Sequence, residues 1–156
     1  KDNLCTADLP TTWGCPSLVA HPPAARDELP VARARTAGAL IVGKTNVPEF
    51  TLEGYTGNPV FGVTRNPWDL ALTPGGSSGG GASAVAAGLG PLSLATDGAG
   101  STRGPASCSG LVGLKATLGI VPYDTDAHVT RYSDTRIHRL LVPSPHIPTL
   151  VPNWVP

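Results

Sequence analysis

The sequence has no methionine, few aromatic residues and little charge. Aromatic side chains make up 5% of its 156 residues and charged side chains 14%, whereas hydrophobic residues reach 40%. We expect a folded core, because disordered chains are poor in hydrophobic residues. With so few aromatic residues, that core must consist mainly of Ala, Val and Leu, which allow helices and strands to pack closely.

Three further scarcities exclude classes of protein. Eleven basic residues balance eleven acidic ones, so the chain lacks the positive surface that binds nucleic acid or an anionic membrane. Cys5, Cys15 and Cys108 are too few and too scattered for a disulfide framework or a zinc site, which favours a reducing, cytoplasmic compartment. The sequence contains no apolar run of about 18 residues that could span a membrane. Because the first residues include no initiating methionine, we expect the chain to be incomplete at its start.

The hydrophobic pattern predicts a helix followed by a short strand, twice. Residues 27–37 predict a helix that Gly38 ends with a left-handed cap, and residues 39–42 predict a buried parallel strand. Residues 82–87 and 92–95 repeat this order. Loops rich in Gly and Ser adjoin these elements, at the positions where α/β proteins bind ligands. The predicted fold class is therefore α/β.

The end of the chain differs in composition. Residues 123–156 are rich in His and Pro and show no helical or strand period. A reading-frame error in a coding sequence can generate such a composition. We therefore divide the chain into a core segment, residues 1–122, and a tail, residues 123–156, for which no regular structure is predicted.

The glycine loop, residues 75–81, reads Gly-Gly-Ser-Ser-Gly-Gly-Gly, which is costly in chain entropy. A flexible linker is disfavoured, since the loop directly precedes a small-residue helix. A phosphate cradle is disfavoured because the P-loop Lys and the G-x-G-x-x-G pattern are missing. Residues 75–79 match the G-x-S-x-G elbow of α/β-hydrolases with Ser77 as nucleophile, but that elbow needs a strand directly before it, and here Pro74 ends a turn.

Several motifs join into one pattern. In chain order these are Lys1-Asp2-Asn3, the Gly-Lys-Thr-Asn-Val-Pro-Glu-Phe run at 43–50, Asn-Pro-Trp-Asp at 66–69, the glycine loop, Thr-Asp-Gly-Ala-Gly-Ser-Thr-Arg at 96–103, and Gly113-Leu114-Lys115. In order and spacing they resemble the amidase signature family, serine hydrolases with a Ser-cisSer-Lys triad, as a fragment incomplete at both ends. The resemblance covers residues 1 to about 122 and implies part of a mixed sheet with flanking helices and long loops.

The resemblance also implies the catalytic residues: Ser101 as nucleophile, Ser77 as the bridging serine in cis-peptide geometry, and Lys1 as base. A serine hydroxyl needs an adjacent base, and lysine can serve only when burial or positive dipoles lower its pKa from about 10.4. Because a hydroxyl both donates and accepts, Ser77 can pass the proton from Ser101 to Lys1 and later back to the leaving nitrogen.

Around the nucleophile, the resemblance implies an oxyanion hole of backbone N–H groups and residues that support the loop. The hole comprises Gly98, Ala99, Gly100 and Ser101, and the supporting residues are Ser78, Asp97 and Arg103. Asp97 and Arg103 are expected to brace the loop by an ion pair or by hydrogen bonds to its backbone. Ala99 stands where the family commonly has Gly, which is tolerated only if the residue does not need a positive φ.

Three other residues are weaker candidates. Lys44 is a second candidate base, although the family places this position in a structural motif at a strand end. Cys108 has no histidine near it in the sequence and is expected to be a small buried thiol. Trp13 is expected to pack, with a position beside a substrate pocket as the alternative.

The predicted function is hydrolysis of a linear carbon–nitrogen amide bond through a serine acyl-enzyme, without metal or organic cofactor. The expected partner is a small-molecule amide, with neither nucleic acid nor membrane, and a homodimer is considered for the full-length parent. One alternative is an A-type amidotransferase component that acts on misacylated tRNA, which the neutral charge and Ala99 disfavour. Another is an inactive remnant or scaffold fragment.

Overall fold

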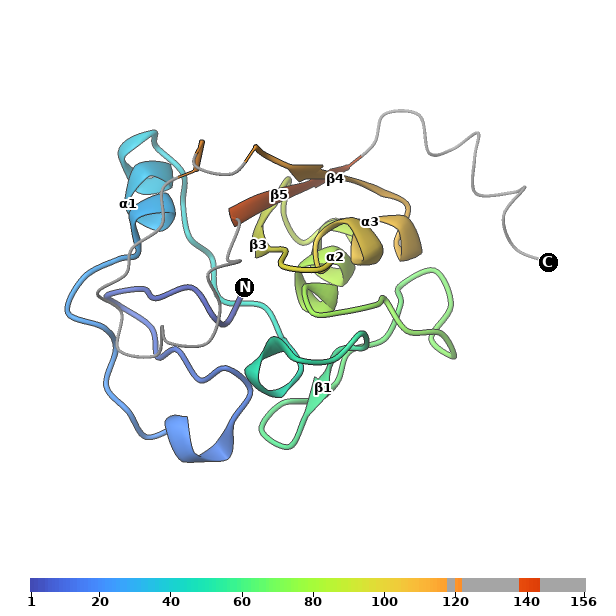
Figure 1. Ribbon diagram of the computed structural model, residues 1–156, viewed down its shortest axis with the longest axis horizontal. Helices are drawn as coiled ribbons and strands as arrows, with labels where there is room; N and C mark the ends of the chain where they lie inside the picture. Colours follow the sequence, from blue (N-terminus) through green and yellow to red (C-terminus); the bar gives the residue numbers. More distant parts are fainter. Residues whose placement is uncertain (118–119, 122–137, 144–156) are drawn as a thin grey trace.

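The computed structural model describes residues 1–117, 120–121 and 138–143, and Figure 1 shows a small sheet with helices packed against it. The sheet has the strand order β3–β5–β4 and consists of β3 (Ser93–Thr96), β5 (His138–Pro143) and β4 (Leu111–Lys115). β5 runs antiparallel to both neighbours. A second sheet pairs β1 (Gly57–Asn58) with β2 (Gly62–Val63). The predicted class, a partial α/β core with long loops, is confirmed.

Two helices cover one face of the sheet. The α-helices are α1 (Leu29–Thr36), α2 (Gly79–Ala86) and α3 (Arg103–Cys108), and the 3-10 helices are η1 (Pro16–Leu18) and η2 (Glu49–Thr51). α2 and α3 lie against the sheet, and α1 lies to one side (Figure 1). Ala82, Ala95 and Ala106 form the core between these layers, with Leu111 packed against it. At Gly113 an added Cβ would lie 2.7 Å from the Ala106 Cβ, so α3 approaches β4 as closely as small residues allow.

Close packing also explains why the loop of residues 75–81 is rich in glycine. α2 begins at Gly79, inside this loop and three residues before the predicted start. A Cβ on Gly79 would overlap the Thr56 hydroxyl, and one on Gly80 would overlap the backbone of Asn46. At Gly76 an added Cβ would lie 2.5 Å from the carbonyl oxygen of Glu53. Glycine is therefore required here by close approach of other chain segments, and the loop is part of the core.

The helix predicted over residues 27–37 is confirmed as α1, and Gly38 follows it with a φ of +89°. The strand predicted over residues 39–42 is wrong, since it has no strand partner in the described part of the chain. The Leu40 and Val42 side chains are 89% and 90% exposed. A hydrophobic run becomes a strand only where a neighbour takes its backbone hydrogen bonds. Here the run lines one wall of a groove of about 300 Å³ whose other wall includes β3.

The second predicted pair is confirmed as α2 and β3, and Gly88 follows α2 with a φ of +75°. The prediction of no regular structure in the tail is wrong at residues 138–143, because β5 finds hydrogen-bond partners in β3 and β4. The other tail residues, 123–137 and 144–156, with most of the His and Pro of the tail, lie outside the described residues. The boundary after residue 122 stays a prediction. No helix in the described ranges is long and apolar enough to cross a membrane.

Candidate active site

The first residues of the chain bring a lysine into contact with the glycine loop. Lys1 is 6% exposed, and its Nζ donates hydrogen bonds to Ser77 Oγ at 2.7 Å and to the carbonyl oxygen of Thr96 at 3.2 Å. Ser77 is 1% exposed and follows a cis peptide bond from Gly76. The main-chain nitrogen of Lys1 lies 3.1 Å from the carbonyl oxygen of Leu94 in β3. The structure therefore brings together two of the three predicted catalytic side chains, which are 76 positions apart in the sequence.

The burial of Lys1 changes its chemistry. Desolvation lowers the pKa of Lys1 from 10.5 to about 7, and the negative charge of Asp97 opposes this change. At neutral pH, Lys1 is therefore divided between the ammonium and the neutral amine. When the neutral amine donates a hydrogen to Thr96, its lone pair remains for the hydroxyl of Ser77. This is the protonation state that a base requires.

Thr96, the last residue of β3, is a site residue that the sequence did not reveal. Its carbonyl oxygen accepts from Lys1 Nζ at 3.2 Å, Ser78 Oγ at 3.2 Å and Thr102 Oγ1 at 3.3 Å. Ser78 and Thr102 directly precede α2 and α3. One backbone oxygen thus links the lysine to the starts of both helices. No side-chain pattern could have indicated it, because a carbonyl group is present in every residue.

Asp97 supports the loop that carries Ser101. It is fully buried, and its two oxygens accept the backbone N–H groups of Gly100 (2.7 Å), Thr102 (3.3 Å) and Arg103 (3.3 Å). The Arg103 guanidinium adds two further hydrogen bonds, at 2.9 and 3.1 Å. Burial alone would raise the pKa of Asp97, but the hydrogen bonds from Arg103 and the backbone outweigh it and hold the pKa well below its ordinary value. Asp97 is therefore a carboxylate at neutral pH. It supports the loop both by the ion pair with Arg103 and by hydrogen bonds to the loop backbone, as expected.

The predicted oxyanion donors differ in their availability. The Gly100 N–H already donates to Asp97, whereas the N–H groups of Gly98, Ala99 and Ser101 donate to no other described residue. Ala99 has no positive φ, so its methyl group does not strain the loop. Three of the four predicted N–H groups therefore have no acceptor among the described residues.

Ser101 adjoins the glycine loop through the backbone. It is half-buried, and its carbonyl oxygen accepts the N–H of Ser78 at 3.2 Å. Within the described ranges its hydroxyl forms no hydrogen bond with Ser77 or Lys1. The structure thus places the predicted nucleophile next to the Lys1–Ser77 pair without a direct side-chain hydrogen bond.

Thr56 supports the glycine loop from the other side, and sequence reasoning missed it too. Its fully buried hydroxyl donates to the carbonyl oxygen of Gly75 at 2.9 Å and accepts the N–H of Gly79 at 3.1 Å. It therefore holds the loop on both sides of Ser77. An isolated threonine in a loop gives no signal of this role in the sequence.

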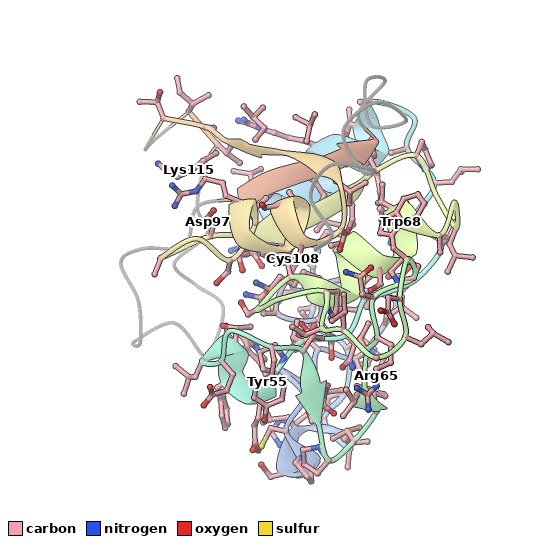
Figure 2. The ribbon with its side chains drawn as sticks, turned by 90° about the vertical axis from the view of Figure 1, so that its right-hand side faces the viewer. Tyr55, Arg65, Trp68, Asp97, Cys108 and Lys115 are labelled. Atoms are coloured by element: carbon pink, nitrogen blue, oxygen red, sulfur yellow. The ribbon has the colours of Figure 1, made fainter. Side chains whose placement is uncertain are left out.

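The alternative sites find less support. No strand directly precedes Ser77, so the elbow of an α/β-hydrolase lacks its context. Cys108 is exposed, so the expectation of a buried thiol is wrong; it ends α3, where Ala106 takes the core-facing position. In Figure 2, Asp97 and Trp68 lie on opposite sides of α3. Trp13 is 6% exposed and packs, as expected.

Among residues 1–117, 120–121 and 138–143, no three His, Cys, Asp or Glu side chains gather as ligands for a metal ion.

This geometry combines a buried lysine–serine pair with a glycine-rich turn in which three N–H groups have no acceptor among the described residues. The chain matches the Amidase family model over residues 1–135, and it belongs to this family. The A-type component of the glutamyl-tRNA(Gln) amidotransferase of Rhodopirellula baltica is 54% identical over 121 residues, which cover 78% of this chain and 24% of that protein. The chain spans about a quarter of the length of the curated relatives it matches.

Solved structures agree with this assignment. A 6-aminohexanoate cyclic dimer hydrolase complexed with substrate superposes with a TM-score of 0.84 at 36% identity, covering 92% of this chain and 30% of that chain. A bacterial aryl acylamidase of the amidase signature enzymes gives a TM-score of 0.82 at 30% identity, covering 90% of this chain and 29% of that chain. The fold is therefore part of the amidase fold of carbon–nitrogen hydrolases.

Proposed function

We propose that the protein hydrolyses amide bonds through an acyl-enzyme on Ser101, with Ser77 as proton relay and Lys1 as base. The observation that carries this proposal is the 2.7 Å contact between Lys1 Nζ and Ser77 Oγ, made by a lysine whose pKa burial lowers to about 7. Burying a lysine against a hydroxyl costs stability, and a lysine whose pKa is lowered by burial marks a candidate functional site.

The reaction proceeds in two stages, acylation of Ser101 and hydrolysis of the acyl-enzyme. Ser101 Oγ bonds to the carbonyl carbon while its proton passes through Ser77 to Lys1, and the resulting oxyanion accepts the free N–H groups of the turn. The proton then returns through Ser77 to the leaving nitrogen as the carbon–nitrogen bond breaks. Water attacks the acyl-enzyme by the same relay, which releases the acid and restores Ser101.

A second candidate function is supported by sequence identity. The curated relative with 54% identity is part of an amidotransferase, whereas the hydrolases of known structure are 36% and 30% identical. Both functions need the same attack on an amide, so the described site supports either. They differ in the product: an amidase releases ammonia or an amine into water, whereas the amidotransferase reaction amidates glutamyl-tRNA(Gln). This second function would still need an amide as the source of nitrogen, and it would add RNA as a partner.

The test is covalent labelling with a serine-reactive fluorophosphonate, followed by intact-mass measurement and peptide mapping. We expect one adduct on Ser101 that is lost in Ser101→Ala and strongly slowed in Lys1→Ala. Ser107→Ala, an exposed serine of α3, is the matched control and should be labelled like the wild type. An adduct on Ser77 would indicate an α/β-hydrolase mechanism instead. A folded protein without any adduct would support an inactive remnant.

A further pair of assays separates the two functions. Ammonia release from simple linear amides supports the amidase, and amidation of glutamyl-tRNA(Gln) supports the transferase. A cytoplasmic location and a homodimer of a longer parent remain part of the proposal, to be tested by fractionation and by light scattering.

A further inference from the structure

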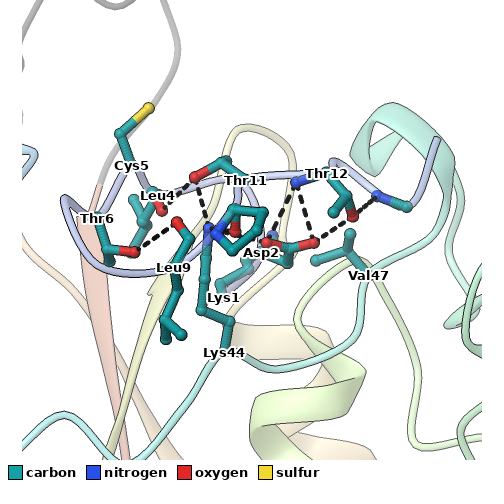
Figure 3. Close-up of polar contacts among 12 residues, drawn as sticks. Lys1, Asp2, Leu4, Cys5, Thr6, Leu9, Thr11, Thr12, Lys44 and Val47 are labelled. Atoms are coloured by element: carbon teal, nitrogen blue, oxygen red, sulfur yellow. Dashed lines mark hydrogen bonds and ion pairs between the residues drawn. The ribbon is translucent and has the colours of Figure 1, made fainter. Parts of the chain in front are cut away.

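A second buried lysine lies beside the segment that carries Lys1. The Lys44 side chain is 10% exposed, and its Nζ lies 2.8 Å from Asp2 Oδ1. It also donates to the carbonyl oxygen of Pro10 at 2.9 Å and to Thr11 Oγ1 at 2.6 Å (Figure 3). These three acceptors use all three hydrogens of an ammonium group. Burial lowers the pKa of Lys44, and the hydrogen bond and charge of Asp2 oppose this change. As an ammonium in contact with these three acceptors, Lys44 has no lone pair to offer as a base.

Asp2 is held equally firmly. Its other carboxylate oxygen accepts the hydroxyl of Thr12 at 2.5 Å and the N–H of the same residue at 3.3 Å. Its own N–H donates to the carbonyl oxygen of Thr45 at 3.0 Å, and its carbonyl oxygen accepts the N–H of Trp13 at 3.0 Å. Figure 3 shows this carboxylate between Lys44 and Thr12, directly after Lys1. Side chain and backbone together leave Asp2 little freedom to move.

We propose that the ion pair of Lys44 and Asp2 positions the catalytic base, holding Lys1 where its Nζ reaches Ser77, without either residue touching the reacting atoms. Asp2 is the covalent neighbour of Lys1, so a displacement of Asp2 moves Lys1 as well. A misplacement of about 1 Å in a catalytic group can cost about a hundredfold in rate. This inference rests on the proposed function, because it assigns the pair a role through Lys1.

We expect the pair also to limit the access of water to Lys1, which is 6% exposed. The charged groups around this residue are Asp97, which attracts its ammonium, and Asp2, Lys44 and Glu28, which surround its main-chain nitrogen. Burial is the main cause of the lowered pKa of Lys1. Removing one member of the pair leaves the other charge buried without its partner, which loosens the segment. Water then reaches the ammonium of Lys1, and its pKa rises towards 10.5.

The experiment measures the rate of fluorophosphonate labelling of Ser101 against pH in Lys44→Met and Asp2→Asn. We expect the midpoint to move up by at least one pH unit, which lowers the rate at pH 7 about fivefold by the loss of neutral amine. Lys44→Arg keeps a cation opposite Asp2 and should shift the midpoint less. Lys115→Met, an exposed lysine of β4, is the matched control and should behave like the wild type.

A folded Lys44→Met protein with the wild-type midpoint would overturn the proposal, even if its maximal rate is lower. If Lys44→Met does not fold, Thr11→Val removes only one acceptor of Lys44 and is expected to shift the midpoint in the same direction. An NMR titration of the Lys1 side chain follows the same pKa without any labelling. This titration therefore tests the role of the Lys44–Asp2 pair independently of the proposed function. The proposed function has its own test, because it fails if Ser101→Ala is still labelled.

Discussion

The lowered pKa of Lys1 makes the pH dependence of serine labelling a direct test of the mechanism. Only the neutral amine can accept the proton of Ser101 through Ser77, so the labelling rate should follow the fraction of neutral Lys1. The relevant perturbation is pH alone, with no substitution that could disturb the fold. The prediction is a sigmoidal rise whose midpoint lies close to pH 7.

The size of the effect follows from that pKa. A lysine with a pKa of about 7 is about one-eleventh neutral at pH 6 and about ten-elevenths neutral at pH 8, a tenfold rise in rate. A solvent-exposed lysine, with its pKa of about 10.4, would be only about 0.4% neutral at pH 8. Burial of Lys1 therefore raises the reactive fraction at pH 8 about two-hundredfold.

The assay is the pseudo-first-order rate of adduct formation from pH 5.5 to 9.5, measured by intact mass. Lys1→Ala should remove the rise, and Lys115→Met should retain it. The rate measured with Ser101→Ala at each pH is subtracted as the background of the reagent. A wild-type midpoint above about pH 9, or a rise that persists in Lys1→Ala, would refute the assignment of Lys1 as the base.

Four further predictions concern stability. Asp97→Ala leaves the N–H groups of Gly100, Thr102 and Arg103, of which that of Thr102 is buried, without their acceptor, and it should lower the free energy of unfolding in urea by about 2–4 kcal/mol. Because the pKa of Asp97 lies below its ordinary 3.8, this carboxylate stabilises the fold above pH 3.8, and the stabilisation is lost as the pH falls towards the lowered pKa. If Asp97→Ala lost the same amount of unfolding free energy on acidification as the wild type, this would be contradicted. Gly80→Ala should cost about 1–3 kcal/mol, since its Cβ overlaps the backbone of Asn46, and a neutral result in thermal unfolding would show that the loop can move away. Gly104→Ala should stabilise by about 0.4–1 kcal/mol, because its Cβ meets nothing within 4 Å, and a lower melting temperature would disprove that reading.

Much of the local structure followed from the sequence. The helix of residues 27–37 and its glycine cap, and the pair of α2 and β3, were predictable because periodicity and caps act over a few residues. The failures at 39–42 and 138–143 have one physical cause. Whether a hydrophobic run becomes a strand depends on a partner that is distant in sequence. Of these two runs, only residues 138–143 have such partners in the described part of the chain.

The candidate site divides in the same way. The sequence by itself determined the kinds of residue present, namely a lysine, paired serines in a glycine loop and a second serine loop, and their order along the chain. Only the tertiary structure decided that Lys1 is buried against Ser77, that Thr96 offers its carbonyl to three donors, and that Gly100 gives its N–H to Asp97. These properties depend on desolvation and on distances between atoms far apart in the chain, which no local pattern of residues encodes.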